Sequence, residues 1–134
     1  MLRMLDTDTA SYIIKGRSPV IEVKLASISP TLLCVSAVTR AELIYGLKSL
    51  PASHRLHQAV RQFFKIVRVL PWDADAADFY AEIRHQFVTT GQLIGELDMM
   101  IAAHSLSANA VLVTNNLRHY QRIAQPLTLE NWTV

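Results

Sequence analysis

Short apolar runs alternate with longer amphipathic segments along this chain. The apolar runs are bounded by polar or turn residues, a pattern typical of buried strands; they lie at 2–5, 32–35, 67–70 and 110–113. A further stretch at 127–132 is typical of an edge strand. Between the runs, apolar residues recur at helical spacing and predict helices at 11–15, 20–27, 39–47, 52–64, 73–88, 99–107 and 120–123.

Local signals mark where several of these helices begin and end. Gly16 and Gly91 follow amphipathic segments and are expected to end them, and Pro19 suits the first turn of the next helix. Thr39 and Glu42 have the spacing of a capping box, in which the two residues satisfy each other's backbone at a helix start. The regular alternation of strand and helix predicts an α/β fold with a mainly parallel sheet, and 134 residues suit one domain spanning 1–134.

Composition adds only weak limits on function. Hydrophobic residues make up 51% of the chain and charged residues 18%, which excludes a disordered protein. The net charge of +2 permits a polyanionic partner without requiring one. The single cysteine, Cys34, lies in an apolar run and is expected to be a buried hydrophobe. The start of the chain lacks the pattern of a signal peptide and no apolar run could span a bilayer, so we expect a cytoplasmic protein without membrane contact.

Polar side chains gather where predicted strands end or helices begin. In parallel α/β sheets, ligands bind at the carboxyl ends of the strands. Carboxylates brought together there favour a hard divalent cation such as Mg²⁺ or Mn²⁺, and the absence of CxxC and HExxH motifs argues against zinc. The candidates are Asp6, Asp8, Glu42, Asp98, Asn115 and Asn116.

Each acidic candidate also has a purely structural interpretation. Asp6 and Asp8 are suitable helix caps, and Asp98 could complement a helix dipole. Glu42 is explained as well by the capping box as by metal binding. Because these residues are far apart in sequence, spacing alone does not establish that they converge.

Five blocks of sequence, taken in order, are similar to blocks of a known protein family. Residues 4–8, MLDTD, are similar to the family's MLDTN start, and 35–46, VSAVTRAELIYG, resemble its second block. Residues 94–104, IGELDMMIAAH, resemble the third block, and 111–116, VLVTNN, with 129–132, LENW, complete the order. The matches cover both ends and the middle of the chain, and the family that they resemble is the VapC-type toxins of the PIN-domain ribonucleases.

The resemblance implies a three-layer α/β/α PIN fold and an endoribonuclease that depends on Mg²⁺ or Mn²⁺. It assigns Asp6, Glu42 and Asp98 as metal-binding catalytic carboxylates, with Asn116 at a fourth catalytic position that is acidic in many PIN domains. Asp8 stands where asparagine is more usual. Arg40, Lys48, Arg84, His85, Arg118, His119 and Arg122 are candidates to guide RNA, whereas His104, Trp72 and Trp132 are expected to pack.

The resemblance also implies partners. These are a cognate VapB-type antitoxin, a second copy of the toxin in a homodimer, a toxin–antitoxin hetero-oligomer, operator DNA reached only through the antitoxin, and an RNA substrate, with transfer RNA a candidate. The antitoxin is expected to place a basic residue in the acidic pocket.

Two other functions fit parts of the sequence. Asp6 and Asp8 nearly match the DxDx(T/V) motif of haloacid-dehalogenase-like phosphotransferases, in which the first aspartate attacks phosphorus, although the last position of the motif differs. A non-catalytic PIN-like binding module is the other alternative, and a cleavage assay distinguishes it from the nuclease.

Overall fold

A five-stranded parallel sheet forms the centre of the structure, a computed structural model that describes residues 1–92 and 94–133. Neighbouring strands pair in the order β3-β2-β1-β4-β5, and every pair is parallel. The predicted strands are confirmed, with the one near the C-terminus at an edge. Their bounds are β1 (Arg3–Leu5), β2 (Leu33–Ser36), β3 (Arg68–Leu70), β4 (Val111–Val113) and β5 (Leu129–Glu130).

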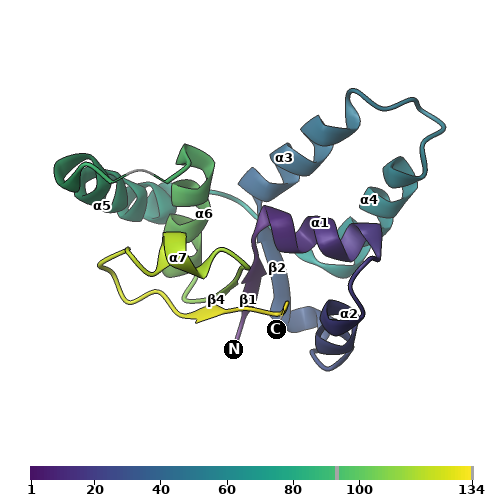
Figure 1. Ribbon diagram of the computed structural model, residues 1–134, viewed down its shortest axis with the longest axis horizontal. Coiled ribbons are helices and arrows are strands. Elements are labelled where there is room, and N and C mark those ends of the chain that lie inside the picture. The colour runs from purple at the N-terminus through teal and green to yellow at the C-terminus, as the bar shows by residue number, and fades with distance from the viewer. Residues whose placement is uncertain (93, 134) are drawn as a thin grey trace.

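Helices cover both faces of this sheet, with α5 and α6 on one side and α1, α2 and α4 on the other (Figure 1). The α/β/α fold class predicted from the sequence is therefore confirmed. No described helix is both long and apolar enough to cross a membrane. The helices are α1 (Thr7–Lys15), α2 (Pro19–Ala26), α3 (Ala37–Leu47), α4 (Arg55–Ile66), α5 (Ala74–Thr90), α6 (Glu96–Ser107) and α7 (Leu117–Tyr120), with a 3-10 turn at Pro30–Leu32.

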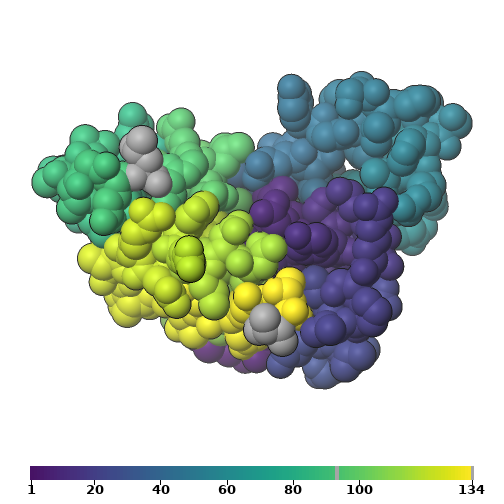
Figure 2. Space-filling view, in the orientation of Figure 1, coloured from purple at the N-terminus to yellow at the C-terminus, as the bar shows by residue number. Residues whose placement is uncertain are grey.

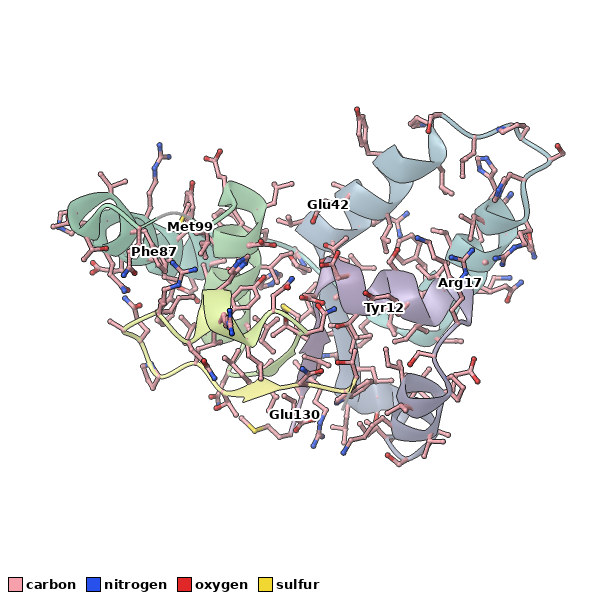
Figure 3. The ribbon with its side chains drawn as sticks, in the orientation of Figure 1. Tyr12, Arg17, Glu42, Phe87, Met99 and Glu130 are labelled. Atoms are coloured by element: carbon pink, nitrogen blue, oxygen red, sulfur yellow. The ribbon has the colours of Figure 1, made fainter. Side chains whose placement is uncertain are left out.

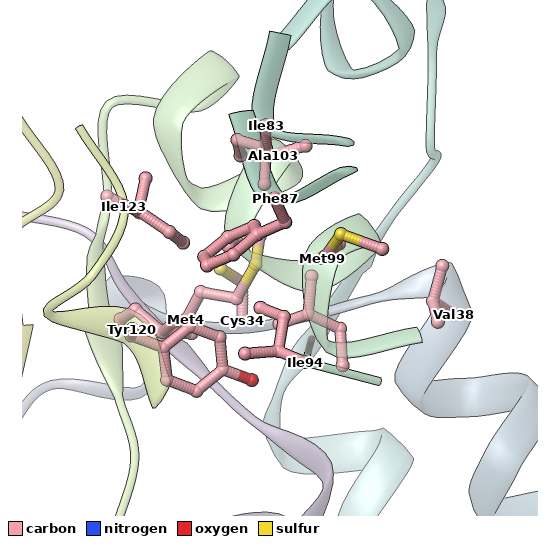
Figure 4. Close-up of a cluster of buried hydrophobic side chains, with 14 residues drawn as sticks. Met4, Cys34, Val38, Ile83, Phe87, Ile94, Met99, Ala103, Tyr120 and Ile123 are labelled. Atoms are coloured by element: carbon pink, nitrogen blue, oxygen red, sulfur yellow. The ribbon is translucent and has the colours of Figure 1, made fainter. Parts of the chain in front are cut away.

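The strands divide the core into two apolar clusters because successive side chains point to opposite faces. Met4, Cys34 and Leu112 face α5 and α6, where Phe87 and Tyr120 complete the packing (Figure 4). The next residues along β1, β2 and β4 face α1 and α4; they are Leu5, Val35 and Val113. Cys34 is fully buried, as expected, and burial raises the pKa of its thiol to about 12.

The start of α3 differs from the sequence prediction. The helix begins at Ala37, and the Ser36 hydroxyl caps it by accepting a hydrogen bond from the Val38 backbone N–H at 3.1 Å. Thr39 is therefore already inside the helix, and the predicted capping box between Thr39 and Glu42 is wrong. Since Ser36 both ends β2 and caps α3, the Glu42 carboxylate is left for other contacts.

The C-terminal residues are tied back onto the sheet. Arg3 on β1 donates to both carboxylate oxygens of Glu130 on β5, at 3.2 and 3.3 Å. The indole N–H of Trp132 donates to the same carboxylate at 2.8 Å, and Trp132 is 1% exposed. Trp72 also packs, donating to the Met100 carbonyl at 2.9 Å. The packing roles expected for both tryptophans are confirmed.

Candidate active site

The topology places the polar candidates around one point of the sheet. After β1 the chain crosses to β2 and then β3 on one side, whereas β4 and β5 lie on the other side of β1. The connections leaving β1 and β4 therefore diverge at the carboxyl edge, which is where α/β sheets of this kind bind ligands. Asp6 follows β1 directly, and Asn115 and Asn116 follow β4 after one residue.

Asp6 is a buried carboxylate at the centre of this edge, with 3% of its surface exposed. Its Oδ1 caps α1 by accepting from the Thr9 backbone N–H at 2.9 Å. Burial raises the pKa of Asp6, hydrogen bonds from Thr114 and Thr9 oppose that shift, and the charge of Asp8 adds to it. The capping interpretation thus accounts for Oδ1 of Asp6. It does not neutralise the negative charge of the buried Asp6 carboxylate.

Asp8 and Asn116 connect the two diverging loops. The side-chain amide of Asn116 donates to Asp8 Oδ2 at 3.2 Å. Asn116 stands at the start of α7, but its side chain makes no capping bond there. Its amide is instead directed at a carboxylate of the acidic group, which places Asn116 at the edge of the candidate site.

Asp98 reaches the same group from the first turn of α6, as the sequence predicted, although the helix begins two residues earlier at Glu96. Burial raises the pKa of Asp98, Tyr120 and His119 oppose the shift, and the charge of Asp8 adds to it. The Tyr120 hydroxyl is buried and has no partner at hydrogen-bonding distance among the described residues, yet it lies near enough to Asp98 to affect its titration. The charge of Asp8 thus raises the pKa of both Asp6 and Asp98.

Glu42 is held at the site by α1. It lies on α3 beside the start of α1 (Figure 3), and its Oε1 accepts from the Thr7 hydroxyl at 2.6 Å. The Thr7 hydroxyl also lies 3.1 Å from that of Thr39. Thr7 follows Asp6 immediately, so this contact brings the third predicted carboxylate to the same edge of the sheet.

The donor set suits a hard divalent cation. Ion pairs to lysine or arginine in the described residues involve only Glu130 and Glu96, so none of the four candidate carboxylates has such a counter-ion. Oxygen ligands and uncompensated charge are the properties that Mg²⁺ and Mn²⁺ require. In the described residues, no three acidic, histidine or cysteine side chains form a ready-made metal cage. Asp6 and Glu42 instead bond to Thr9 and Thr7.

Two grooves border this acidic site. One, of about 210 Å³, lies between α1, α3 and α4 and includes Thr7 and Glu42 in its wall. The other, of about 550 Å³, is mostly apolar and lies between α3 and α6; it is lined by Val38, Ala41, Glu42, Tyr45, Leu97 and Met100. In the space-filling view, a hollow separates the green α6 segment from the blue α3 segment (Figure 2). Glu42 is common to both grooves.

Two of the basic candidates are engaged elsewhere. The Arg40 guanidinium stacks over the Phe64 ring at 4.5 Å, and Arg84 pairs with Glu96 at 3.7 Å. Arg118 and His119 lie beside Asn116 in a polar pocket next to the acidic group. Of these two, Arg118 is exposed, and it is the basic residue that the structure places best to meet a ligand at the carboxylates.

A buried histidine supports the start of α3. His104 on α6 is 3% exposed, and its Nδ1 lies 2.8 Å from the Ser36 hydroxyl. Since that hydroxyl accepts from Val38 N–H, it can donate its own proton to an unprotonated Nδ1. His104 therefore packs, as expected, and helps to position the helix that carries Glu42.

We expect acid to destabilise the protein through His104. Burial lowers the pKa of His104 below its ordinary value of 6.5, and the charge of Asp73 opposes this. A lowered folded-state pKa means that the neutral ring favours folding above pH 6.5 and that this contribution is lost as the pH falls toward the folded-state value. We expect the free energy of unfolding, measured in urea, to fall between about pH 7.5 and about pH 5. This fall should be smaller for His104→Gln than for the wild type. An equal loss in both proteins would contradict this assignment.

Comparisons with known proteins identify the family of this chain. Residues 3–125 match the family model described as PIN domain. The chain is 36% identical over 129 residues to the tRNA(fMet)-specific endonuclease VapC of Salmonella typhimurium, covering 96% of each protein. It is also 31% identical over 134 residues to Ribonuclease VapC2 of Rickettsia felis, covering 98% of each.

Solved structures agree as well. The DNA-bound VapBC of Salmonella typhimurium contains a chain that superposes with a TM-score of 0.90 at 36% identity, covering 98% of this chain and 99% of that one. The fold, the carboxylates at the switch point of the sheet and the family match together define the class: this chain belongs to the PIN domain family. Family membership favours the nuclease interpretation of Asp6 over the phosphotransferase one.

Proposed function

We propose that this protein is a Mg²⁺- or Mn²⁺-dependent endoribonuclease that acts as the toxin of a VapBC-type toxin–antitoxin system. The observation that carries the proposal is the gathering of Asp6, Asp8, Glu42 and Asp98 at the carboxyl edge of the sheet, with no lysine or arginine paired to any of them in the described residues. The names of its relatives, ribonuclease and tRNA-specific endonuclease, support the same activity.

Asp6, Glu42 and Asp98 are the residues that would hold the cation. A bound divalent ion supplies electrostatic stabilisation of the phosphate and lowers the pKa of an attacking water. The chain itself orients the ligands: Thr9 holds one oxygen of Asp6, and Thr7 holds one oxygen of Glu42. Asn116 holds Asp8, which keeps a fourth carboxylate within the electrostatic range of the others.

The same proposal includes a partner. Solved relatives are VapBC complexes, and those of Salmonella typhimurium and Rickettsia felis are bound to DNA. We infer that this chain pairs with a VapB-type antitoxin and reaches operator DNA through it. An arginine or lysine of the antitoxin placed among the unpaired carboxylates is a natural substitute for the metal. Transfer RNA is the favoured substrate class because the Salmonella relative is named for cutting it.

The proposal is tested with purified protein, labelled transfer RNA and an unrelated structured RNA. Cleavage should appear with Mg²⁺ or Mn²⁺, stop on addition of EDTA and return when the metal is restored in excess. Zinc should not replace these ions, because the donor set contains oxygen alone. Absence of cleavage on every RNA with either metal would favour the non-catalytic binding module. Trapping of a phosphorylated Asp6 would favour the phosphotransferase.

A further inference from the structure

A second polar pocket adjoins the carboxylates. It has a volume of about 300 Å³ and lies where the loop after β4 and helix α7 meet the C-terminal segment. We call it the asparagine pocket. It is lined by Asn115, Asn116, Leu117, Arg118, His119 and Asn131.

Two residues that line the asparagine pocket carry a buried hydrogen-bonding atom without a partner among the described residues. Asn115 Oδ1 and His119 Nδ1 are both buried and unpaired among the described residues. Buried polar atoms are nearly always hydrogen-bonded in folded proteins, so such atoms call for a ligand or water. Asn131 adds a donor: its Oδ1 accepts from the Thr133 backbone N–H at 2.8 Å and from the Thr133 hydroxyl at 2.6 Å, which leaves its amino group for the pocket.

The pocket and the acidic site share a wall. Asn116 lines the pocket, and its amide donates to Asp8 at 3.2 Å. His119 lines the same pocket. A ligand in the pocket would therefore lie beside any phosphate bound at the carboxylates.

The donor and acceptor pattern selects the kind of ligand. A phosphate offers acceptors only, which cannot satisfy the buried Asn115 carbonyl oxygen. A metal ion is disfavoured because none of the described residues that line the pocket carries a carboxylate. An RNA base offers N–H donors and carbonyl or ring-nitrogen acceptors on one edge, and single-stranded bases are read by such contacts. The exposed Arg118 can meet the adjoining phosphate or stack on the base.

We propose that the asparagine pocket binds the base of a nucleotide next to the scissile phosphate and gives the enzyme a base preference at that position. This inference rests on the proposed ribonuclease function. Asn115 and Asn131 supply an acceptor and a donor, and His119 adopts the tautomer that the base requires. None of the three is among the proposed metal ligands, so recognition and metal binding can be separated by mutation.

The test uses Asn115→Leu and His119→Phe, which keep side-chain volume and remove the hydrogen-bonding atoms. The wild-type enzyme and each variant cut a pool of single-stranded RNA with randomised bases, and the products are sequenced. The wild type should prefer particular bases at one fixed position beside the cut. In the variants, the ratio of cleavage at preferred bases to cleavage at other bases should fall about tenfold, since a base contact of this kind is worth roughly one hydrogen bond. The variants should still cut the pool. His85→Phe, on the exposed face of α5, is the matched control and should keep the preference.

A preference that survives in both variants, or a wild type with no preference beside the cut, would overturn the inference.

A second measurement does not depend on cleavage. In NMR titrations of the intact protein with the four nucleoside 5′-monophosphates, the side-chain amide signals of Asn115 and Asn131 should shift, and inorganic phosphate should not shift them. Equal shifts with phosphate would indicate an anion site, and no shift would indicate an empty pocket; either result overturns base binding. If the amide signals shift with nucleotides but no RNA is cut, the proposed ribonuclease function is refuted and base binding in the pocket is not.

Discussion

Asp98→Asn is expected to remove metal-dependent RNA cleavage and to leave the fold intact. The amide keeps the shape of the side chain and can still accept a hydrogen bond, but it cannot supply the charge that holds a divalent cation. Burial and the neighbouring Asp8 raise the pKa of Asp98, which means that the ionised form is disfavoured in the folded protein. The metal-free variant should therefore melt at the same temperature as the wild type or higher.

Two measurements on the same preparation check this prediction. Mn²⁺ should raise the melting temperature of the wild type, because a ligand that binds only the folded state stabilises it, and should raise that of Asp98→Asn much less. Asp78→Asn, an exposed position on α5, is the matched control and should behave as the wild type in both assays. Cleavage by Asp98→Asn at the wild-type rate under matched metal would remove Asp98 from the site.

Glu42→Gln is expected to reduce cleavage by at least tenfold, about 1.4 kcal/mol in transition-state free energy. The structure removes the capping explanation for Glu42, because Ser36 caps α3 and the Glu42 carboxylate accepts from Thr7 instead. The glutamine oxygen can accept the same bond from Thr7, so the local geometry should survive. The loss is then assigned to the missing negative charge.

Melting of the metal-free protein separates the two roles of Glu42. If the main role of Glu42 were structural, Glu42→Gln and Glu42→Ala would differ in melting temperature, and both would keep the wild-type cleavage rate per folded molecule. If it is a metal ligand, both variants should lose cleavage and the Mn²⁺-induced stabilisation alike. Glu82→Gln, exposed on α5, is the control for a lost charge away from the site. Unchanged cleavage by Glu42→Gln would refute the metal role.

The parts of the site that follow strands were predictable from sequence. Asp6 and Asn116 come shortly after apolar runs, and the rule that ligands gather at the carboxyl ends of parallel strands places them near one another. Asp98 was predicted as a polar residue at a helix start. Its convergence with Asp8 depends on how α6 packs, which no local pattern specifies.

Other features could not be predicted because they depend on pairing between distant segments. Both Ser36 and Thr39 are suitable caps, and the choice between them depends on where β2 ends, which is set by its register with β3, Ser36 opposite Leu70. The approach of Tyr120 to Asp98 brings together α7 and α6, which are separated by β4 in the sequence and pack in the same apolar cluster. Sequence blocks resembling a known family could indicate the class of the site, whereas these contacts required the structure.

The anchoring of the C-terminal segment affects recognition as well as folding. Asn131 lies between Glu130, which is bound by Arg3, and Trp132, whose ring is buried in the core. Because both neighbours are fixed, Asn131 loses little conformational entropy when a ligand binds. A base bound by Asn131 would therefore contact a side of the pocket that is already ordered. Discrimination between bases would then depend partly on an ion pair that lies outside the asparagine pocket.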